Sequence, residues 1–175
     1  LSADDFPDLP LVESGNSIQV KSATLVNSLK STLFASSSDE AKQLLTGVHL
    51  KFDNKSIEAA ATDGHRLAVL NIDKNLSDNE NLKLDSKDIF SVTLPSRSLR
   101  EIERLMSSVS SDEIVNLFYE SGQVVFLAEN QIITSRTLEG VYPNYHQLIP
   151  NEFSNTLEIK RRDLIAALER IAVLA

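Results

Sequence analysis

The sequence predicts an α+β domain in which two βαβββ units place helices on one face of antiparallel sheet. Three observations support this prediction. Short alternating apolar runs precede helical patterns at three places, turn-forming residues join the strand-like runs that follow, and the same plan begins again near the C-terminus. Recurrence of one unit along a chain indicates a repeated architecture.

A strand followed by a helix is predicted three times. The three segments are SIQVKSATLVNSL (17–29), DIFSVTLPSRSLREI (88–102) and NTLEIKRRDLIAAL (155–168). In each, apolar residues first alternate and then recur every three or four positions, as in a strand that leads into a helix. Ser22 and Pro95 suit two of the helix starts, as N-cap and first helical residue. The predicted helices are 21–34, 95–106 and 160–170.

Three strands are predicted after each of the first two helices. They cover 44–52, 56–62 and 65–72 in the first half, and 113–120, 123–129 and 131–138 in the second. Asp63-Gly64 and Ser121-Gly122 have the composition of hairpin turns. We expect Asp63 and Gly64 to occupy the positive-φ positions of a two-residue type I′ turn. The polar stretch 71–88 is predicted to be a mobile loop between the halves.

The segment FPDLP (6–10) resembles YPNYHQLIP (142–150), and both precede the same strand–helix pattern. A unit of roughly 137–139 residues therefore starts again. A coincidence between two proline-rich linkers is the alternative. We expect residues 1–16 to be the tail of one domain and its linker, 17–150 a complete domain, and 151–175 the opening strand and helix of a third. Because the chain stops at Ala175, directly after this opening strand and helix, we expect the third domain to be truncated.

The composition is that of a globular protein, with 42% hydrophobic and 24% charged residues among 175. The chain has no cysteine, so disulfides and thiolate metal sites are excluded. No apolar run approaches the ~20 residues that cross a bilayer, and Leu1–Pro10 does not have the pattern of a signal peptide. The net charge of −8 argues mildly against a nucleic-acid partner.

Positive charge is nevertheless concentrated in the three predicted helices, which carry nine basic and four acidic residues. Arg97, Arg100 and Arg104 recur on one face of the second helix, and the opposite face carries the stripe expected to be buried, Leu99, Ile102 and Met106. Such a face favours a polyanion, and with no aromatics among the arginines it suits the backbone of a duplex better than single strands. Lys30 of the first helix joins this predicted set. An ordinary solvated face is the alternative.

The stretch ATDGHRLAV (61–69) has the residues of a catalytic site without a complete constellation. His65 is one of three histidines, and none has a second metal ligand at a suitable spacing. A hydrolase or transferase that uses Asp63 and His65 is a weaker hypothesis, because the sequence offers no nucleophile to accompany them. We therefore predict no catalytic residue, no metal and no cofactor.

Together with RTLEGVYPNYHQLIP (136–150) and LLTGV (44–48), this stretch resembles the bacterial beta sliding clamp family, the beta subunit of DNA polymerase III. The resemblance covers essentially the whole chain. It implies the DNA-clamp fold and a non-catalytic processivity factor of the bacterial cytoplasm. Two three-domain subunits would close around duplex DNA with helices lining the hole. It also implies partners: the polymerase III alpha subunit, the clamp loader, and other polymerases and repair proteins. The full-length protein would be a homodimer and this fragment a monomer.

The resemblance further implies a pocket between the second and third domains that binds short hydrophobic peptides, often Gln-Leu-x-Leu-Phe-like. Position by position, its residues here would be Leu45, Thr62, Gly64, His65, Arg66, Leu67, Pro143, Gln147 and Leu148. Arg97 matches a family position that faces DNA, whereas Arg100 and Arg104 follow from helix phase alone. A protein-binding scaffold without a DNA role is the remaining alternative.

Overall fold

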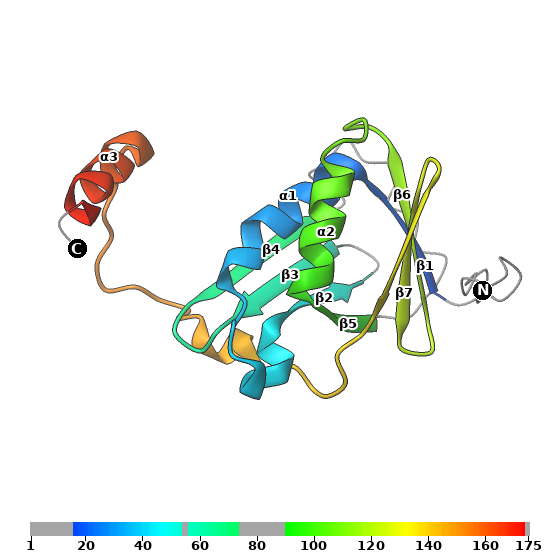
Figure 1. Ribbon diagram of the computed structural model, residues 1–175. Coiled ribbons are helices and arrows are strands. Elements are labelled where there is room, and N and C mark those ends of the chain that lie inside the picture. Colours follow the sequence, from blue (N-terminus) through cyan, green and yellow to red (C-terminus); the bar gives the residue numbers. More distant parts are fainter. Residues whose placement is uncertain (1–15, 54–55, 74–89, 174–175) are drawn as a thin grey trace, which may run out of the picture. The chain divides into compact units, whose positions relative to one another are not determined.

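The computed structural model describes residues 16–53, 56–73 and 90–173, and its chain divides into two units, Leu1–Pro143 (unit 1) and Asn144–Ala175 (unit 2). Unit 1 follows the predicted order of strand, helix and three strands, twice (Figure 1). The first half consists of β1 (Asn16–Lys21), α1 (Ser22–Thr32), β2 (Gly47–Phe52), β3 (Ser56–Thr62) and β4 (Leu67–Asp73). The second half consists of β5 (Phe90–Pro95), α2 (Ser96–Met106), β6 (Ile114–Glu120), β7 (Gln123–Ala128) and β8 (Gln131–Arg136).

The two halves exchange their first strands. One antiparallel sheet has the order β1-β6-β7-β8 and the other β4-β3-β2-β5. Ile18 of β1 therefore lies opposite Leu117 of β6, and Leu50 of β2 lies opposite Val92 of β5. Each sheet contains three strands of one half and the leading strand of the other.

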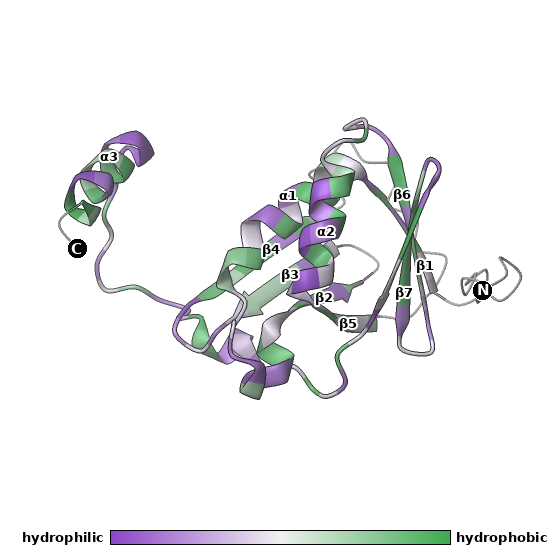
Figure 2. Cartoon of the chain, viewed as in Figure 1, coloured by the Kyte–Doolittle hydropathy of each residue, from purple (hydrophilic) through white to green (hydrophobic). Residues whose placement is uncertain are grey.

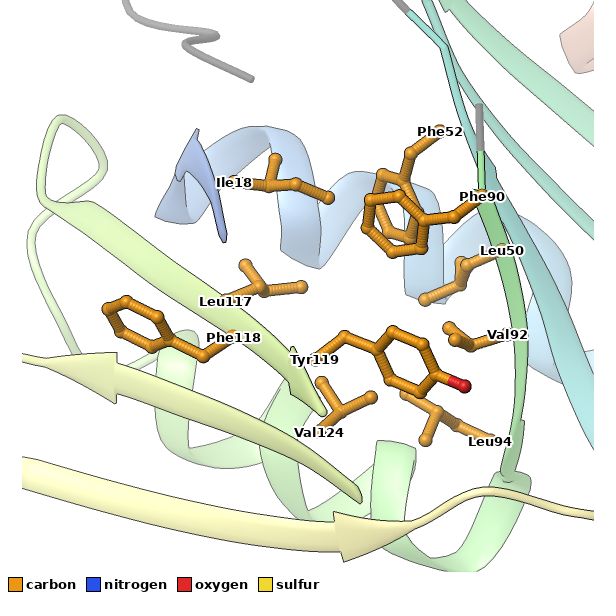
Figure 3. Close-up of a pocket in the computed structure, with 10 residues that line it drawn as sticks. All are labelled: Ile18, Leu50, Phe52, Phe90, Val92, Leu94, Leu117, Phe118, Tyr119 and Val124. Carbon is orange, nitrogen blue, oxygen red and sulfur yellow. The ribbon is translucent and has the colours of Figure 1, made fainter. Parts of the chain in front are cut away.

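The inner faces of the two sheets meet in an apolar core. Figure 3 shows Ile18 and Leu117 from one sheet facing Leu50 and Val92 from the other. Three aromatic rings extend this contact: the ring centroids are 4.9 Å apart for Phe52 and Phe90, and 5.7 Å apart for Phe90 and Tyr119. Offset stacking of this kind adds to the free energy that burial of the rings already provides.

Helices α1 and α2 contact each other and lie over the sheet β4-β3-β2-β5 (Figure 1). The predicted buried stripe of α2 is confirmed, because Leu99 and Ile102 are 0% exposed and Met106 is 1% exposed. Hydrophilic residues occupy the other face of this helix, as Figure 2 shows. Burial of one stripe thus fixes which face of α2 meets solvent.

Both predicted helix starts were wrong by one residue. Lys21 and Pro95 are the N-cap residues, so Ser22 is the first helical residue of α1 and Pro95 lies outside α2. Ser22 does not cap because its hydroxyl donates to the carbonyl of Met106 at 2.8 Å. Its backbone N–H donates to Glu113, also at 2.8 Å. The first bond ties the start of α1 to the end of α2, and the second ties it to the residue before β6.

The prediction that the strand 44–52 begins at residue 44 was also wrong, because residues 44–46 are not a strand. It forms the end of a 3₁₀ helix, η3 (Glu40–Thr46), and the strand begins only at Gly47. A Cβ atom at Gly47 would stand 2.6 Å from the carbonyl oxygen of Leu94, so β2 and β5 can begin their close pairing only at a glycine. A further short 3₁₀ helix, η2 (Leu33–Ala35), follows α1.

The predicted mobile loop 71–88 begins too early, because β4 continues through Asp73. The rest of that stretch lies outside the described residues. Unit 2 contains a 3₁₀ helix, η4 (Tyr145–Leu148), and α3 (Arg161–Ala172). The strand expected through Leu157 and Ile159 does not form, because the described part of unit 2 contains no strand with which it could pair. None of the helices in the described ranges has the length and apolar character to span a membrane.

We predict that Leu99→Ala destabilises the protein by about 2–5 kcal/mol, because it removes a fully buried side chain and leaves a cavity under α2. The exposed neighbour Arg100 provides the matched control, and Arg100→Ala should change the free energy of unfolding by less than about 0.5 kcal/mol. Urea unfolding measures both. Equal effects of the two substitutions would contradict the assigned helix face.

Candidate functional site

The loop between β3 and β4 is longer than predicted. The strands close at the pair Thr62↔Leu67, so four residues, 63–66, form the loop. Only Gly64 among them has a positive φ, +94°. The prediction of a two-residue type I′ turn at Asp63-Gly64 was therefore wrong. Ser121 and Gly122 do form the tight connection predicted for them, with φ values of 50° and 77° between the paired residues Glu120 and Gln123.

The carboxylate of Asp63 organises this loop. Its Oδ1 accepts hydrogen bonds from the backbone N–H groups of His65 at 2.9 Å and Arg66 at 3.0 Å. Its Oδ2 accepts from Nε of Arg66 at 2.9 Å. The N–H bonds from His65 and Arg66, followed by the guanidinium, lower the pKa of Asp63 to about 2. The side chain of Asp63 thus accepts the backbone N–H groups that a shorter hairpin would have paired across its two strands.

Thr62 closes the loop from the other side. Its hydroxyl donates to the carbonyl of Arg66 at 2.7 Å and accepts from the N–H of Gly64 at 3.1 Å. Its own backbone N–H donates to the hydroxyl of Tyr142 at 3.2 Å. The side chains of Thr62 and Asp63 therefore hold the conformation of the loop, together with Tyr142, which is distant in the sequence.

The loop presents its remaining side chains outward. His65 is exposed, and its backbone N–H donates to Asp63, whereas its ring makes no hydrogen bond to the described residues. The guanidinium of Arg66 lies 5.9 Å from the centroid of the Phe34 ring, and Phe34 is 57% exposed. A cation over an exposed aromatic ring forms a surface that has both apolar area and charge.

Helix η3 lies beside this loop. The Nζ of Lys42 would be 3.9 Å from a Cβ atom at Gly64. Leu44 packs so closely on Gly140 that a Cβ there would stand 2.9 Å from Cδ1 of Leu44. Leu45, which follows in η3, is half-buried, and its carbonyl accepts from the N–H of Ser37 at 2.8 Å. Segments 40–46, 62–67 and 138–142 are thereby neighbours in unit 1.

The predicted peptide-binding residues thus fall into two groups. The members in unit 1 are carried by η3, by the 62–67 hairpin and by the segment that contains Tyr142; they are Leu45, Thr62, Gly64, His65, Arg66, Leu67 and Pro143. Gln147 and Leu148 belong to η4 of unit 2. Sequence reasoning missed Phe34 and Tyr142 as neighbours of the loop, since neither stands within a recognisable spacing of it.

Asp63 and His65 do not form a catalytic dyad. Both carboxylate oxygens of Asp63 are engaged by backbone N–H groups and Arg66, and His65 reaches Asp63 through its backbone, not its ring. In the described ranges no group of three or more acidic or histidine side chains could hold a metal ion. The geometry therefore suits recognition better than proton transfer.

A second candidate surface is the exposed face of α1 and α2. Arg97 and Arg100 are exposed and make no ion pair in the part of the chain that the structure describes. Arg104 pairs with Glu101 at 2.8 Å, and Lys30 lies 3.6 Å from Glu103. The four predicted cations therefore share a pair of adjacent helices, and two of them already face a carboxylate.

We predict that the Asp63 carboxylate titrates near pH 2, well below its ordinary 3.8, in a ¹³C NMR titration of the folded protein. Because the folded-state pKa is lowered, the loop's contribution to stability is present above about pH 4 and is lost as the pH falls toward 2. Arg66→Ala should leave the pKa still below 3.8, since the backbone donors lower it most. A wild-type midpoint near 3.8 would contradict this arrangement.

Comparison with known proteins identifies the family. The family model for the DNA polymerase III beta subunit, central domain, matches residues 19–144. The whole chain is 51% identical to the beta sliding clamp of Synechococcus elongatus and 47% identical to that of Synechocystis sp., and it covers 45% and 46% of those proteins. The chain thus spans about half the length of these curated relatives.

A solved structure gives the same result. The DNA polymerase sliding clamp from Bacillus subtilis matches the whole chain with a TM-score of 0.87 and 31% sequence identity, over 43% of the length of that protein. This likeness supports the α+β clamp fold predicted from the sequence. The chain belongs to the DNA polymerase III beta subunit family.

Proposed function

We propose that this chain is the central part of a DNA sliding clamp, the processivity factor of a replicative DNA polymerase. The observation that carries the proposal is the match of the whole chain to proteins named beta sliding clamp, at 51% identity in one case. The complete protein would have three such domains per subunit, and two subunits would form a ring around duplex DNA. It would act in the bacterial cytoplasm.

The basic face of α1 and α2 would lie toward the DNA. These two helices carry four cationic and two carboxylate side chains, although the chain as a whole has a net charge of −8. Phosphates attract such a face whatever the base sequence, and contacts of this kind allow movement along a duplex. The guanidinium groups of Arg97 and Arg100, which are exposed and have no ion-pair partner among the described residues, would make the main contacts.

The 62–67 hairpin would be one wall of the site that takes partner peptides. Leu45, Leu67 and Pro143 would supply apolar surface, and the exposed side chains of His65 and Arg66 would supply a polar edge, whereas the buried Thr62 would support the loop from within. Peptide sites commonly combine an apolar floor with a few polar groups that fix orientation. The polymerase III alpha subunit, the clamp loader, other polymerases and repair proteins would dock here through short hydrophobic motifs.

The proposed role is accessory and needs no catalytic group in this chain. The carboxylate of Asp63 shapes the recognition loop, and its hydrogen bonds to backbone N–H groups and Arg66 leave it unsuited to act as a general base. A hydrolase that uses Asp63 and His65 is therefore the weaker candidate. A scaffold without DNA contact differs from a clamp in one measurable respect, which is retention on DNA.

We predict that the double substitution Arg97→Glu and Arg100→Glu in the full-length protein shortens retention on nicked circular DNA. The loss of two phosphate contacts should reduce the slope of log binding constant against log salt by about two. Arg136→Glu on β8, an exposed arginine away from both helices, is the control and should leave retention unchanged. Unchanged retention of the double variant would favour the scaffold.

We predict that His65→Ala weakens binding of a Gln-Leu-Ser-Leu-Phe peptide about tenfold without unfolding the loop, because only the backbone of His65 takes part in the turn. Fluorescence anisotropy with the full-length protein measures the affinity. Asn130→Ala, in the corresponding turn of the second half, is the control. Equal affinity of all three proteins would place the peptide elsewhere. Intrinsic hydrolytic turnover lost on His65→Ala would support the enzyme instead.

A further inference from the structure

Tyr142, a residue outside the predicted site, makes a hydrogen bond to the first residue of the 62–67 hairpin. Tyr142 is buried, and its hydroxyl accepts the backbone N–H of Thr62 at 3.2 Å. Burial raises the pKa of this hydroxyl, so the group stays protonated and accepts through an oxygen lone pair. Eighty positions separate the two residues in the sequence.

The position of this bond in the sheet explains its importance. The pairing of β2 with β3 ends at His49↔Ala60, whereas β3 and β4 remain paired as far as Thr62↔Leu67. The end of β3 therefore extends two residues beyond its pairing with β2. The hydroxyl of Tyr142 receives a backbone N–H at the point where the ladder with β2 has stopped. A buried N–H without a partner would cost free energy, so this bond fixes the end of β3.

Tyr142 is itself held rigidly. Its ring stacks on the imidazole of His49, with centroids 4.8 Å apart and planes within 12°. Nδ1 of His49 lies 3.0 Å from the hydroxyl oxygen of Thr93, which fixes the imidazole in turn. Burial lowers the pKa of His49, so its ring is neutral at physiological pH. A chain of contacts therefore runs from β5 through β2 and Tyr142 to the loop.

The tyrosine also borders open space. It lines a cleft of about 520 Å³ together with His49, Thr93 and Tyr119. Tyr119 offers a matched comparison, because it is half-buried in the same cleft and its hydroxyl makes no hydrogen bond in the described part of the chain. The two tyrosines differ in what their hydroxyl groups hold.

We propose that Tyr142 is a positioning residue for partner recognition, whose hydroxyl sets the end of β3 and so the place at which His65 and Arg66 meet a peptide. This inference rests on the proposed function, since it assumes that the 62–67 hairpin contacts the peptide. It adds a residue that does not itself touch the peptide. The side-chain oxygen of Thr62 holds Gly64 and Arg66, so a shift of Thr62 moves the whole loop.

The test compares Tyr142→Phe with Tyr119→Phe in the full-length protein. Phenylalanine at position 142 keeps the ring stacked on His49 and removes only the hydroxyl. We expect amide hydrogen exchange of Thr62 and the loop to become about fivefold faster in Tyr142→Phe, with exchange in β6 and β7 unchanged. Affinity for a Gln-Leu-Ser-Leu-Phe peptide, measured below the unfolding transition, should fall about fivefold. Tyr119→Phe should change neither.

The two readouts separate the possible failures. Unchanged exchange at Thr62 in Tyr142→Phe would overturn the positioning role, whether or not any peptide binds. Faster exchange with unchanged peptide affinity would overturn its importance for recognition. If the wild-type protein bound no peptide at all, the proposed docking function would fail with this inference, and faster exchange would then report only a structural bond. A uniform rise in exchange throughout unit 1 would show a general loss of stability and also overturn it.

Discussion

Backbone pairing between β1 and β6, and between β2 and β5, joins the two halves of unit 1. Neither half can complete a four-stranded sheet without the leading strand of the other. The halves therefore share one core and must form together. Because α1 and α2 each follow directly after an exchanged strand, the same pairing sets the helices side by side over the sheet β4-β3-β2-β5. The basic helix face and the β3–β4 hairpin both depend on this exchange.

The order of elements could be predicted because it is a local property. Alternation in the sequence places Ile18 and Val20 on one face of a strand, and the recurrence of Leu99 and Ile102 defines one face of a helix. Periodicity carries no information on which strand becomes the neighbour, so the exchange could not be predicted. The predicted start of α1 was wrong for a related reason, since the hydroxyl of Ser22 donates a hydrogen bond to the carbonyl of Met106, a residue 84 positions away.

The candidate site shows the same division. The Asp63-Gly64 pair correctly indicated a turn, but its type was wrong because the carboxylate of Asp63 competes for the backbone N–H groups of His65 and Arg66. Turn propensities describe how readily a residue adopts a positive φ, and they do not include the hydrogen bonds that its side chain makes to the loop backbone. The set of peptide-contacting positions came from the family resemblance and stays a prediction. Tyr142 could not have been placed behind Thr62 from either source, because the bond between them depends on where the pairing of β2 with β3 stops.

The acidic residues on the basic helix face have a consequence for the proposed sliding. Glu101 and Glu103 pair with Arg104 and Lys30, and both cations are exposed, so these surface ion pairs are weak in water and are screened by salt. Under the proposed function, a passing phosphate would replace either carboxylate at little cost, so these cations would add to Arg97 and Arg100 without binding any one phosphate strongly. A surface that both holds and releases a polyanion needs contacts of this strength. Under the proposed function, closure of the ring would keep the protein on DNA, and the helices would need only to lower the barrier to movement between neighbouring phosphates.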